Sequence, residues 1–422
     1  TGALIFNDLK LSFLFNMYFK RTLEDTVLDY SKKFPIVYLE GPCKVGKASL
    51  LKQIKDSKIT TVSLKSLSNR ELAQTNPTLF LQKYKSPLII EDIHLAPQLF
   101  TALKCAVDKD KKAGQYFLTS SVQFNRLKID VSMEGTIAIV KLQGLSQEEK
   151  LSLTSSKAFI PTKAYLDEKE LLLKDKACSY LFHELWKGSN PALYSLEDEC
   201  LTKFYDSYLQ DYLCFEVHNY FKVKDEVEFF RFLKFIASKT SQVINYTAFA
   251  NEFGISNDKL KKWLSILVDS GIVFLQPAYY RNLPYNAIKT PKLHFFDLGL
   301  ACYLLSFTSS NIVEDGPLKE ALVKSYVVSE IVKSYYHRGQ TPNLYYYQDK
   351  EQREIDVLLE EDGLLYPMVI KSKSNPNKDD IRHFEVIDKV LKVPRGCGAV
   401  LCRASSYLPL TKQDYLVPIS YI

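Results

Sequence analysis

Gly41-Pro42-Cys43-Lys44-Val45-Gly46-Lys47-Ala48 is the stretch that decides the fold of this chain. It follows the phosphate-binding pattern G-x-x-x-x-G-K-[ST], in which glycines let backbone N–H groups turn toward phosphate oxygens and the lysine neutralises their charge. The last position departs from the pattern, because Ala48 lacks the hydroxyl that normally holds Mg²⁺. The stretch therefore predicts nucleotide binding together with weak or absent hydrolysis.

The residues on both sides of the loop predict the structure that a phosphate-binding loop requires. The apolar run 36–39 predicts a strand that enters the loop, and 48–54 predicts the helix that leaves it. A strand, a glycine-rich turn and a helix N-terminus together form an anion site. The alternative is a tight turn that happens to contain two glycines and a lysine, and this context favours the anion site. Ser49 replaces the missing hydroxyl only if the loop shifts by one residue. The predicted phosphate ligands are the Lys47 ammonium and the backbone of Gly41, Lys44, Val45, Gly46 and Ala48.

A second apolar strand, 88–90, is followed by two acids, Glu91 and Asp92. In P-loop ATPases the first acid of such a pair holds the Mg²⁺ shell and the second polarises the attacking water. The usual order is Asp then Glu, so here the longer side chain faces the metal and the shorter one faces the water. We therefore expect Glu91 to hold Mg²⁺ through water and Asp92 to be a poor catalytic base.

A third strand, 115–121, ends in hydroxyl residues. A polar residue at the end of this strand commonly lies between the two acids and the γ-phosphate, so Thr119 is the candidate phosphate sensor. From this segment alone, a Ser/Thr cluster that forms a turn is an equal alternative.

The bulk composition limits the class of protein. The 422 residues suffice for two to four domains, and the net charge of +6 permits an anionic partner. The eight cysteines and six histidines are scattered, which argues against a structural zinc site and suits a reducing cytosol. No apolar stretch reaches the roughly 18 residues that a membrane span needs, so we expect a cytoplasmic protein without membrane contact.

The middle of the chain predicts two helical regions. Residues 156–228 are rich in Leu, Glu, Lys and Tyr and predict a helical lid or connector without chemistry of its own. Residues 229–310 predict helix, turn, helix and hairpin, the winged-helix arrangement, whose second helix can lie in a DNA major groove. The alternative is a winged helix that packs against protein and leaves a solvated lysine face. The candidate phosphate contacts are Lys259, Lys261 and Lys262.

The last region reads as helix, strand, strand with Asp356 and strand with Lys371. This order resembles the restriction-endonuclease-like nuclease core, in which an Asp and a Glu two residues before a Lys bind the metal. Mg²⁺ prefers such clustered oxygen ligands. Val369 stands two residues before Lys371, so the central pair is broken, although Glu320 or Glu354 could contribute a carboxylate. The resemblance therefore implies a scaffold kept for packing or binding rather than an active nuclease.

From about Met17 to the C-terminus the order of motifs resembles the prokaryotic AAA-type ATPases that carry a C-terminal domain of unknown function. Their patterns read roughly G-P-R-x-x-G-K-T, L-I-I-D-E-I-Q and L-T-G-S-S, followed by a G-R pair whose arginine is a candidate arginine finger. An arginine finger is worth about 10³–10⁵ in rate, so its absence here, with the other departures, implies slow hydrolysis or none. The chain matches these patterns over 41–47, 88–93 and 118–121. It departs from them at Ala48, Glu91-Asp92, Ser120 and Gly135-Thr136.

Together these readings predict an ATP-binding AAA-type α/β protein with a weakened Mg²⁺ site, weak or absent hydrolysis, and association with DNA through its winged helix. One alternative is a non-catalytic DNA- or protein-interaction module on a relic P-loop scaffold, and another is a metal-dependent nuclease regulated by nucleotide. AAA-type sites usually lie between subunits, which is compatible with an oligomer, but Thr136 removes one reason to expect it. The predicted domains are a P-loop parallel-sheet domain at 1–155, a helical lid at 156–228, a winged-helix region at 229–310 and an inactive α/β restriction-endonuclease-like domain at 311–422.

Overall fold

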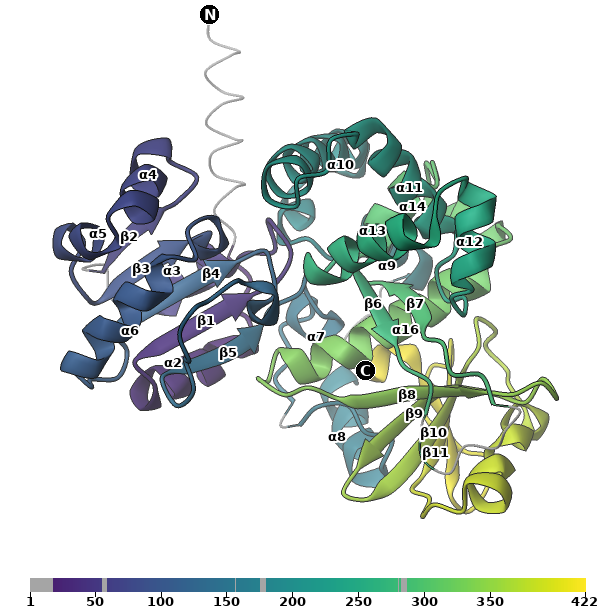
Figure 1. Cartoon of the computed structure of the whole chain (residues 1–422). Helices are drawn as coiled ribbons and strands as arrows, with labels where there is room; N and C mark the ends of the chain where they lie inside the picture. The colour runs from purple at the N-terminus through teal and green to yellow at the C-terminus, as the bar shows by residue number, and fades with distance from the viewer. Residues whose placement is uncertain (1–17, 55–58, 156, 175–179, 280, 282–286) are drawn as a thin grey trace, which may run out of the picture.

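The computed structural model describes residues 18–54, 59–155, 157–174, 180–279, 281 and 287–422. Its first part is a five-stranded parallel sheet with the strand order β2-β3-β4-β1-β5, which lies to one side of the molecule in Figure 1. The central strands are short and almost wholly apolar, as expected for parallel strands that helices cover on both faces. The strands are β1 (Ile36–Glu40), β2 (Thr60–Ser63), β3 (Leu88–Glu91), β4 (Tyr116–Ser120) and β5 (Ile137–Lys141).

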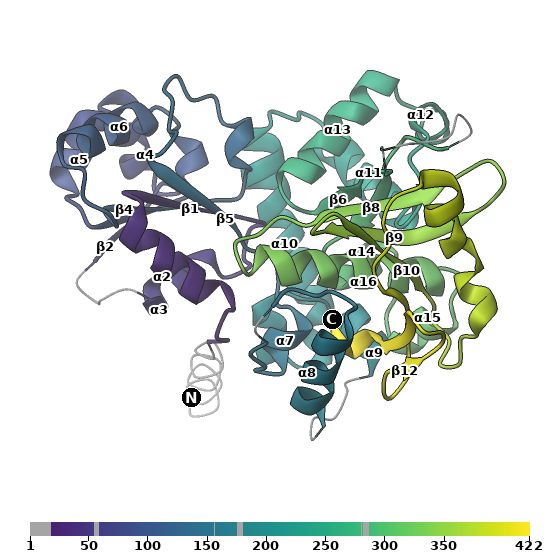
Figure 2. The same cartoon turned by 90° about the horizontal axis from the view of Figure 1, so that it is seen from below.

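Two groups of helices cover the two faces of this sheet. On one face, Leu50 and Leu51 of α3 share a buried apolar cluster with Phe117. On the other face, Phe100 of α6 shares a second cluster with Tyr38. Figure 2 shows α2 and α3 on one side of the sheet and α5 and α6 on the other. These helices are α2 (Leu23–Lys33), α3 (Lys47–Ile54), α4 (Leu67–Thr75), α5 (Pro77–Lys83) and α6 (Leu99–Lys109).

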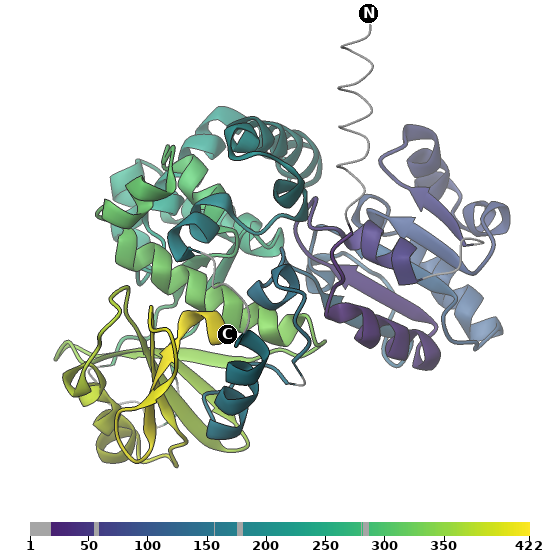
Figure 3. The same cartoon turned by 180° about the vertical axis from the view of Figure 1, so that it is seen from behind.

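A largely helical part follows the sheet and contains a π-helix, a rare form that often occurs at functional sites. The π-helix, Tyr212–Tyr220, continues directly from α10, and we call residues 201–220 the arm. Figure 3 shows these helices from behind. Within the described residues, no helix has the length and apolar content needed to cross a bilayer. The helices are α7 (Gln147–Lys150), α8 (Lys163–Leu173), α9 (Leu181–Lys187), α10 (Leu201–Asp211), α11 (Glu226–Ser238), α12 (Tyr246–Phe253), α13 (Asn257–Asp269), α14 (Leu298–Leu304) and α15 (Ser310–Asp315).

Helices α11, α12 and α13 and the antiparallel pair β6 and β7 follow one another in the order that the sequence predicts for a winged helix. Gly254 ends α12 in the left-handed conformation, and the Ser256 side chain caps α13. Of the predicted wing, Tyr280 and Asn282 lie outside the described residues. The classification of this unit as a winged helix therefore stays a prediction. The two strands are β6 (Val273–Gln276) and β7 (Lys292–Phe295).

The C-terminal part combines the long helix α16, Lys319–Tyr336, with a mixed sheet of strand order β12-β13-β11-β10-β9-β8. Helix α16 contacts β10, β7, α9 and α14 and is buried almost throughout, so it is not an amphipathic surface helix. Its place between the sheet and the helical part is visible in Figure 1. A restriction-endonuclease-like identity stays a prediction. The strands are β8 (Asn343–Gln348), β9 (Glu354–Glu361), β10 (Leu364–Ile370), β11 (Gly398–Cys402), β12 (Leu408–Pro409) and β13 (Asp414–Pro418).

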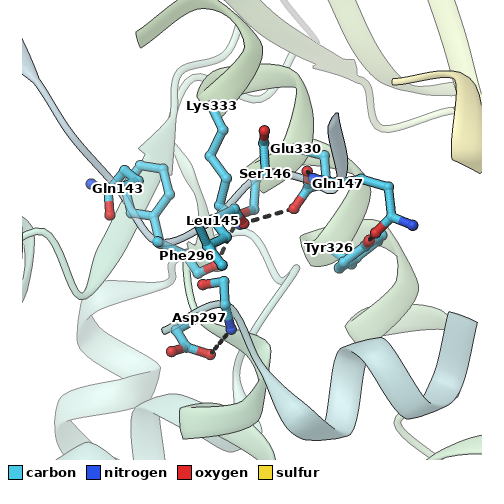
Figure 4. A network of polar contacts seen from close by, with 12 residues as sticks. Gln143, Leu145, Ser146, Gln147, Phe296, Asp297, Tyr326, Glu330 and Lys333 are labelled. Atoms are coloured by element: carbon cyan, nitrogen blue, oxygen red, sulfur yellow. Dashed lines mark hydrogen bonds and ion pairs between the residues drawn. The ribbon is translucent and has the colours of Figure 1, made fainter. Parts of the chain in front are cut away.

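A buried polar network joins the P-loop domain to α16 (Figure 4). The segment after β5, which we call the connector (142–150), runs along this helix. Lys333 donates from Nζ to the Leu145 carbonyl at 3.2 Å, and the backbone N–H of Gln147 donates to Glu330 at 2.8 Å. Lys333 and Glu330 also pair with each other at 2.8 Å. Because buried charges are costly unless they are paired, this network holds the connector in one arrangement.

Candidate functional site

The phosphate-binding loop lies between β1 and α3, as the sequence predicts. Its backbone is left-handed at Lys44 and Gly46, with φ of 60° and 94°. Gly41, with φ of 154°, approaches the neighbouring backbone so closely that a Cβ atom there would lie 1.8 Å from the Leu142 carbonyl oxygen. A side chain at residue 41 is therefore excluded by space, independently of the glycine's conformational freedom.

The Lys47 side chain is buried and folds over the loop. Its ammonium donates to the carbonyl oxygens of Gly41 at 2.7 Å and Pro42 at 2.6 Å. Burial lowers the pKa of Lys47, and the nearby carboxylate of Asp92 partly offsets this effect. Phosphate oxygens are strong acceptors for such a partly desolvated ammonium, so Lys47 is placed to exchange the two carbonyls for a phosphate.

The acids and the candidate sensor lie together at the carboxyl edge of the sheet. Asp92 adopts a left-handed conformation directly after β3, and its backbone N–H donates to Thr119 Oγ1 at 3.3 Å. Glu91 pairs with Lys52 of α3 at 3.4 Å. The structure thus brings together Glu91, Asp92, Thr119 and Lys47 from different parts of the P-loop domain.

The oxygen ligands for Mg²⁺ are incomplete at this edge. Ala48 offers none, and Ser49 is exposed on the first turn of α3. Glu91 and Asp92 remain, and Glu91 already has a cationic partner. Among the residues that the structure describes, no group of three or more acidic, histidine or cysteine side chains is arranged to hold a metal ion. The residues present would hold Mg²⁺ only with a phosphate group as a further ligand, which is how this ion is usually bound.

A pocket of about 450 Å³ opens beside the loop. Its volume lies within the range of small-molecule sites. Aromatic side chains from the segment before α2 form one wall, and the turn after α9 forms another. A base and ribose joined to phosphates on the loop would find both apolar and polar contacts here. The lining residues are Tyr18, Phe19, Arg21, Lys44, Gly46, Ser49, Lys52, Gln53, Pro191, Ala192 and Ser195.

Arg21 lines this pocket and contacts the loop, and sequence analysis did not identify it. Its guanidinium donates to the Val45 carbonyl at 3.0 Å and pairs with Glu149 of the connector at 3.0 Å. Glu149 also faces His337, at the end of α16, at 3.2 Å. Burial disfavours the charged form of Glu149, but Arg21 and His337 outweigh it and hold the pKa of this carboxyl well below its usual range. The loop is thus linked through buried charges to the C-terminal part.

The arm also contacts the loop, although sequence analysis assigned no chemistry to residues 156–228. Lys44 pairs with Asp211 of α10 at 2.6 Å. The Cys43 thiol shares a hydrogen bond with Tyr208, and burial raises the pKa of this thiol to about 11. The second and third variable positions of the loop therefore belong to an interface with the helical part, which a sequence motif cannot reveal.

The π-helix of the arm places Glu216 against the end of the sheet. Its carboxylate lies 3.4 Å from His94 Nε2, and His94 lies 3.3 Å from the Ser121 hydroxyl. Burial disfavours ionisation of Glu216, but His94, Ser121 and Lys47 outweigh it and lower the pKa of this carboxyl. Glu216 therefore stays charged at neutral pH at the edge that carries Asp92 and Thr119.

The predicted DNA-contacting lysines of α13 have different surroundings. Lys259 pairs with Glu228 of α11 at 2.6 Å and lies over the Trp263 ring at 4.5 Å. Lys261 and Lys262 are exposed, and the Lys261 ammonium lies 5.7 Å from the Tyr246 ring centroid. Two of the three predicted contacts are thus accessible, while Lys259 already has partners within the protein.

The nuclease-like residues are only partly brought together. Asp356 and Lys371 line one pocket of about 280 Å³ with Val369. The Lys324 ammonium lies 2.5 Å from Asp356 and also contacts Glu354 at 3.4 Å. A lysine thus neutralises the carboxylates that a divalent cation would need. Glu320, predicted as a further ligand, does not line this pocket and instead accepts from the backbone N–H of Ser372 at 3.3 Å.

The parallel sheet, the loop after β1 and the two acids at the end of β3 are features of a P-loop domain. Residues 33–151 match the family model described as "AAA domain". Residues 179–311 and 319–422 match models of two domains of unknown function, DUF8612 and DUF4143. The chain therefore contains an AAA-type P-loop ATPase-like domain followed by two regions whose families have no assigned function.

Similar proteins are distant in sequence. The uncharacterized proteins Rv2008c of Mycobacterium tuberculosis and Mb2031c of Mycobacterium bovis are each 20% identical over 347 residues, which cover 81% of this chain and 71% of the relative. Among solved structures, the Walker-type ATPase PABY2304 of Pyrococcus abyssi matches with a TM-score of 0.38 and 11% identity, over 68% of this chain and 96% of that one. A variant of RuvB from Thermotoga maritima matches with a TM-score of 0.28 and 16% identity, over 60% of this chain and 87% of that one.

Proposed function

We propose that this protein binds an adenine nucleotide at the phosphate-binding loop and hydrolyses ATP weakly or not at all. The observation that carries the proposal is the Lys47 ammonium, which is buried over the loop and bonded to two of its carbonyls. The pocket beside the loop provides room for a base and ribose. Lys47 and the loop backbone would hold the phosphates, and Glu91 would hold Mg²⁺ through water.

Three departures at the site support the proposal of weak hydrolysis. Catalysis of phosphoryl transfer is mostly positioning and electrostatic stabilisation, supplied by Mg²⁺, a positioned base and cationic groups. Here Ala48 removes one metal ligand, the shorter Asp92 stands at the base position, and Thr136 stands where the family carries an arginine. If the nucleotide stays bound without being hydrolysed, it would act as a conformational signal and not as a source of free energy.

Isothermal titration calorimetry with Mg-ADP and Mg-ATP on the wild type and Lys47→Ala tests the proposal. We expect measurable binding to the wild type and at least roughly tenfold weaker binding to Lys47→Ala, because a charge-assisted hydrogen bond to phosphate is lost. Lys33→Ala, which removes an exposed lysine of the same domain paired with Asp29, is the matched control. Absence of binding to the wild type, or equal affinities in all three proteins, contradicts the proposal.

DNA association is a second candidate function. The exposed Lys261 and Lys262 on α13 favour it, since both face solvent and neither forms an ion pair within the part of the chain that the structure describes. The opposite end of α13 is buried against the P-loop domain, where Asp269 pairs with Arg126 at 2.8 Å. A DNA duplex bound to the first turns of this helix would therefore be coupled to the P-loop domain, because the other end of the helix is packed against that domain.

A further inference from the structure

The Glu216 carboxylate belongs to the arm but is buried against the P-loop domain. It reaches His94, which follows the two acids, and Ser121, which follows the candidate sensor strand. Lys47 is near enough for its charge to lower the pKa of Glu216. The carboxylate thus lies at the edge of the sheet that carries Asp92 and Thr119, the edge toward which the γ-phosphate of a nucleotide on the loop is expected to point, although Glu216 belongs to the arm.

The arm is attached to the loop at a second point. Asp211 pairs with Lys44 at 2.6 Å, and Glu216 lies a little more than one helical turn further along the same continuous helix. An arm held at Asp211 cannot withdraw Glu216 alone, because the π-helix continues α10 without a break. A movement of the helix that withdraws Glu216 therefore also moves Asp211 and strains its ion pair with Lys44.

A diphosphate and a triphosphate make different electrostatic demands on this place. A diphosphate on the loop ends before the edge formed by β3 and β4, whereas the γ-phosphate of a triphosphate brings further negative charge toward it. Like charges brought together in a buried site repel each other strongly unless a cation separates them. Ala48 weakens the Mg²⁺ site that would normally supply this cation.

We propose that Glu216 makes the site distinguish a nucleoside diphosphate from a triphosphate. With the arm in place the site accepts the diphosphate, and a triphosphate binds at the cost of displacing Glu216. This proposal rests on the proposed function, nucleotide binding at the loop. It adds the group that determines whether a nucleotide with two or three phosphates is preferred.

The test is the ratio of the dissociation constants for Mg-ATP and Mg-ADP, measured by calorimetry on the wild type and Glu216→Gln. The amide keeps the shape of the side chain and removes its charge. We expect the wild type to prefer ADP by about tenfold and Glu216→Gln to bring the ratio close to one, through tighter ATP binding. Asp269→Asn is the matched control, because Asp269 also joins the helical part to the P-loop domain through an ion pair, with Arg126.

Each outcome bears on the proposal. An unchanged ratio in Glu216→Gln overturns it while leaving nucleotide binding intact, and an equal change in Asp269→Asn overturns it by showing a loosened interface instead of a charge effect. Equal affinities of the wild type for ADP and ATP also overturn it. This measurement uses the wild type alone, so it does not depend on whether the variants fold. Absence of binding of either nucleotide to either protein contradicts both the proposed function and this inference.

Discussion

At the scale of single residues, the geometry of the loop requires some of the motif's residues. Gly41 has no room for a Cβ atom beside the Leu142 carbonyl, and Lys47 is buried over the loop. Ala48 is the position where the motif's hydroxyl is missing, and the described residues contain no group of three or more Asp, Glu, His or Cys side chains arranged to hold a metal ion. The motif's glycines and lysine are therefore present, and its metal-binding hydroxyl is not.

Ala48→Thr tests this division. The new hydroxyl would restore a Mg²⁺ ligand at the N-terminus of α3, so we expect Mg²⁺-dependent ATP affinity to rise by roughly tenfold and phosphate release to increase. Ala48→Val has nearly the same shape without the hydroxyl and should change neither quantity. Equal behaviour of the two variants would show that the missing hydroxyl is not what limits the site.

Glu149 is the residue that connects Arg21, which contacts the loop, to His337 at the end of α16. Glu149→Gln leaves Arg21 and His337 without their buried acidic partner, and removing one member of a buried pair costs about 3 kcal/mol or more. The folded-state pKa of Glu149 is lowered, so its contribution is fully present above the ordinary glutamate pKa of about 4.3 and is lost as the pH falls further.

Thermal unfolding across a pH range from about 3 to about 8 measures this contribution. We expect the melting temperature of Glu149→Gln to lie well below that of the wild type at neutral pH and the gap to narrow toward the acidic end. Asp29→Asn removes an exposed ion pair with Lys33 and should change stability by less than about 1 kcal/mol. A gap that is constant with pH would mean that the Glu149 charge is not involved.

At the scale of elements, α16 bears on metal binding in the C-terminal sheet and α13 bears on DNA binding. Lys324 of α16 places its ammonium 2.5 Å from Asp356 of β9, where the resemblance to nucleases implies a metal. Lys324→Met should therefore destabilise the protein and allow Mn²⁺ to raise its melting temperature, because a ligand that binds only the folded state stabilises it.

The wild type and Lys324→Arg, which both keep a cation at this position, should show no such shift with Mn²⁺. Thermal unfolding with and without Mn²⁺ is the measurement. An equal shift in all three proteins would mean that the cation binds elsewhere, and no shift in Lys324→Met would mean that these carboxylates cannot hold a metal.

The exposed face of α13 predicts how DNA would bind. We expect Lys261→Ala/Lys262→Ala to reduce the slope of log affinity against log salt by about two, since each phosphate contact contributes about one to this slope. Lys259→Ala should have a smaller effect, because its ammonium already pairs with Glu228. Fluorescence anisotropy of a labelled duplex across a salt series measures the slopes. Wild-type slopes retained in the double variant contradict this interface.

At the scale of the whole molecule, local patterns in the sequence predicted individual helices and strands. Sequence analysis did not identify the contacts between elements that are far apart in the chain. The strands β1, β3 and β4, the loop and α11 to α13 were predicted because apolar runs, glycines and caps mark them locally. The burial of α16 was missed because its polar residues, such as Glu330 and Lys333, face partners far away in the chain. Glu216 was missed for the same reason, since nothing near it in the sequence indicates a contact with His94.

These contacts connect the three parts of the chain around the nucleotide loop. Arg21 and Glu149 link the loop to His337 at the end of α16. In the arm, Asp211 pairs with Lys44 of the loop, and Glu216 contacts His94 after β3. We propose that a nucleotide on the loop would contact the first of the two C-terminal regions at Pro191, Ala192 and Ser195 of the pocket. It would act on the second region only through Arg21 and Glu149. Under the proposed function, this arrangement would let the nucleotide act as a conformational signal.

Hydrogen exchange of the wild type without nucleotide, with Mg-ADP and with Mg-ATP tests this account most directly. We predict slower exchange over residues 41–52 with both nucleotides, and faster exchange over the arm, 201–220, with ATP but not with ADP. Lys47→Ala should show neither change. Unchanged exchange over residues 41–52 with both nucleotides would contradict nucleotide binding at the loop, and an arm that responds equally to ADP and ATP would contradict the role of Glu216.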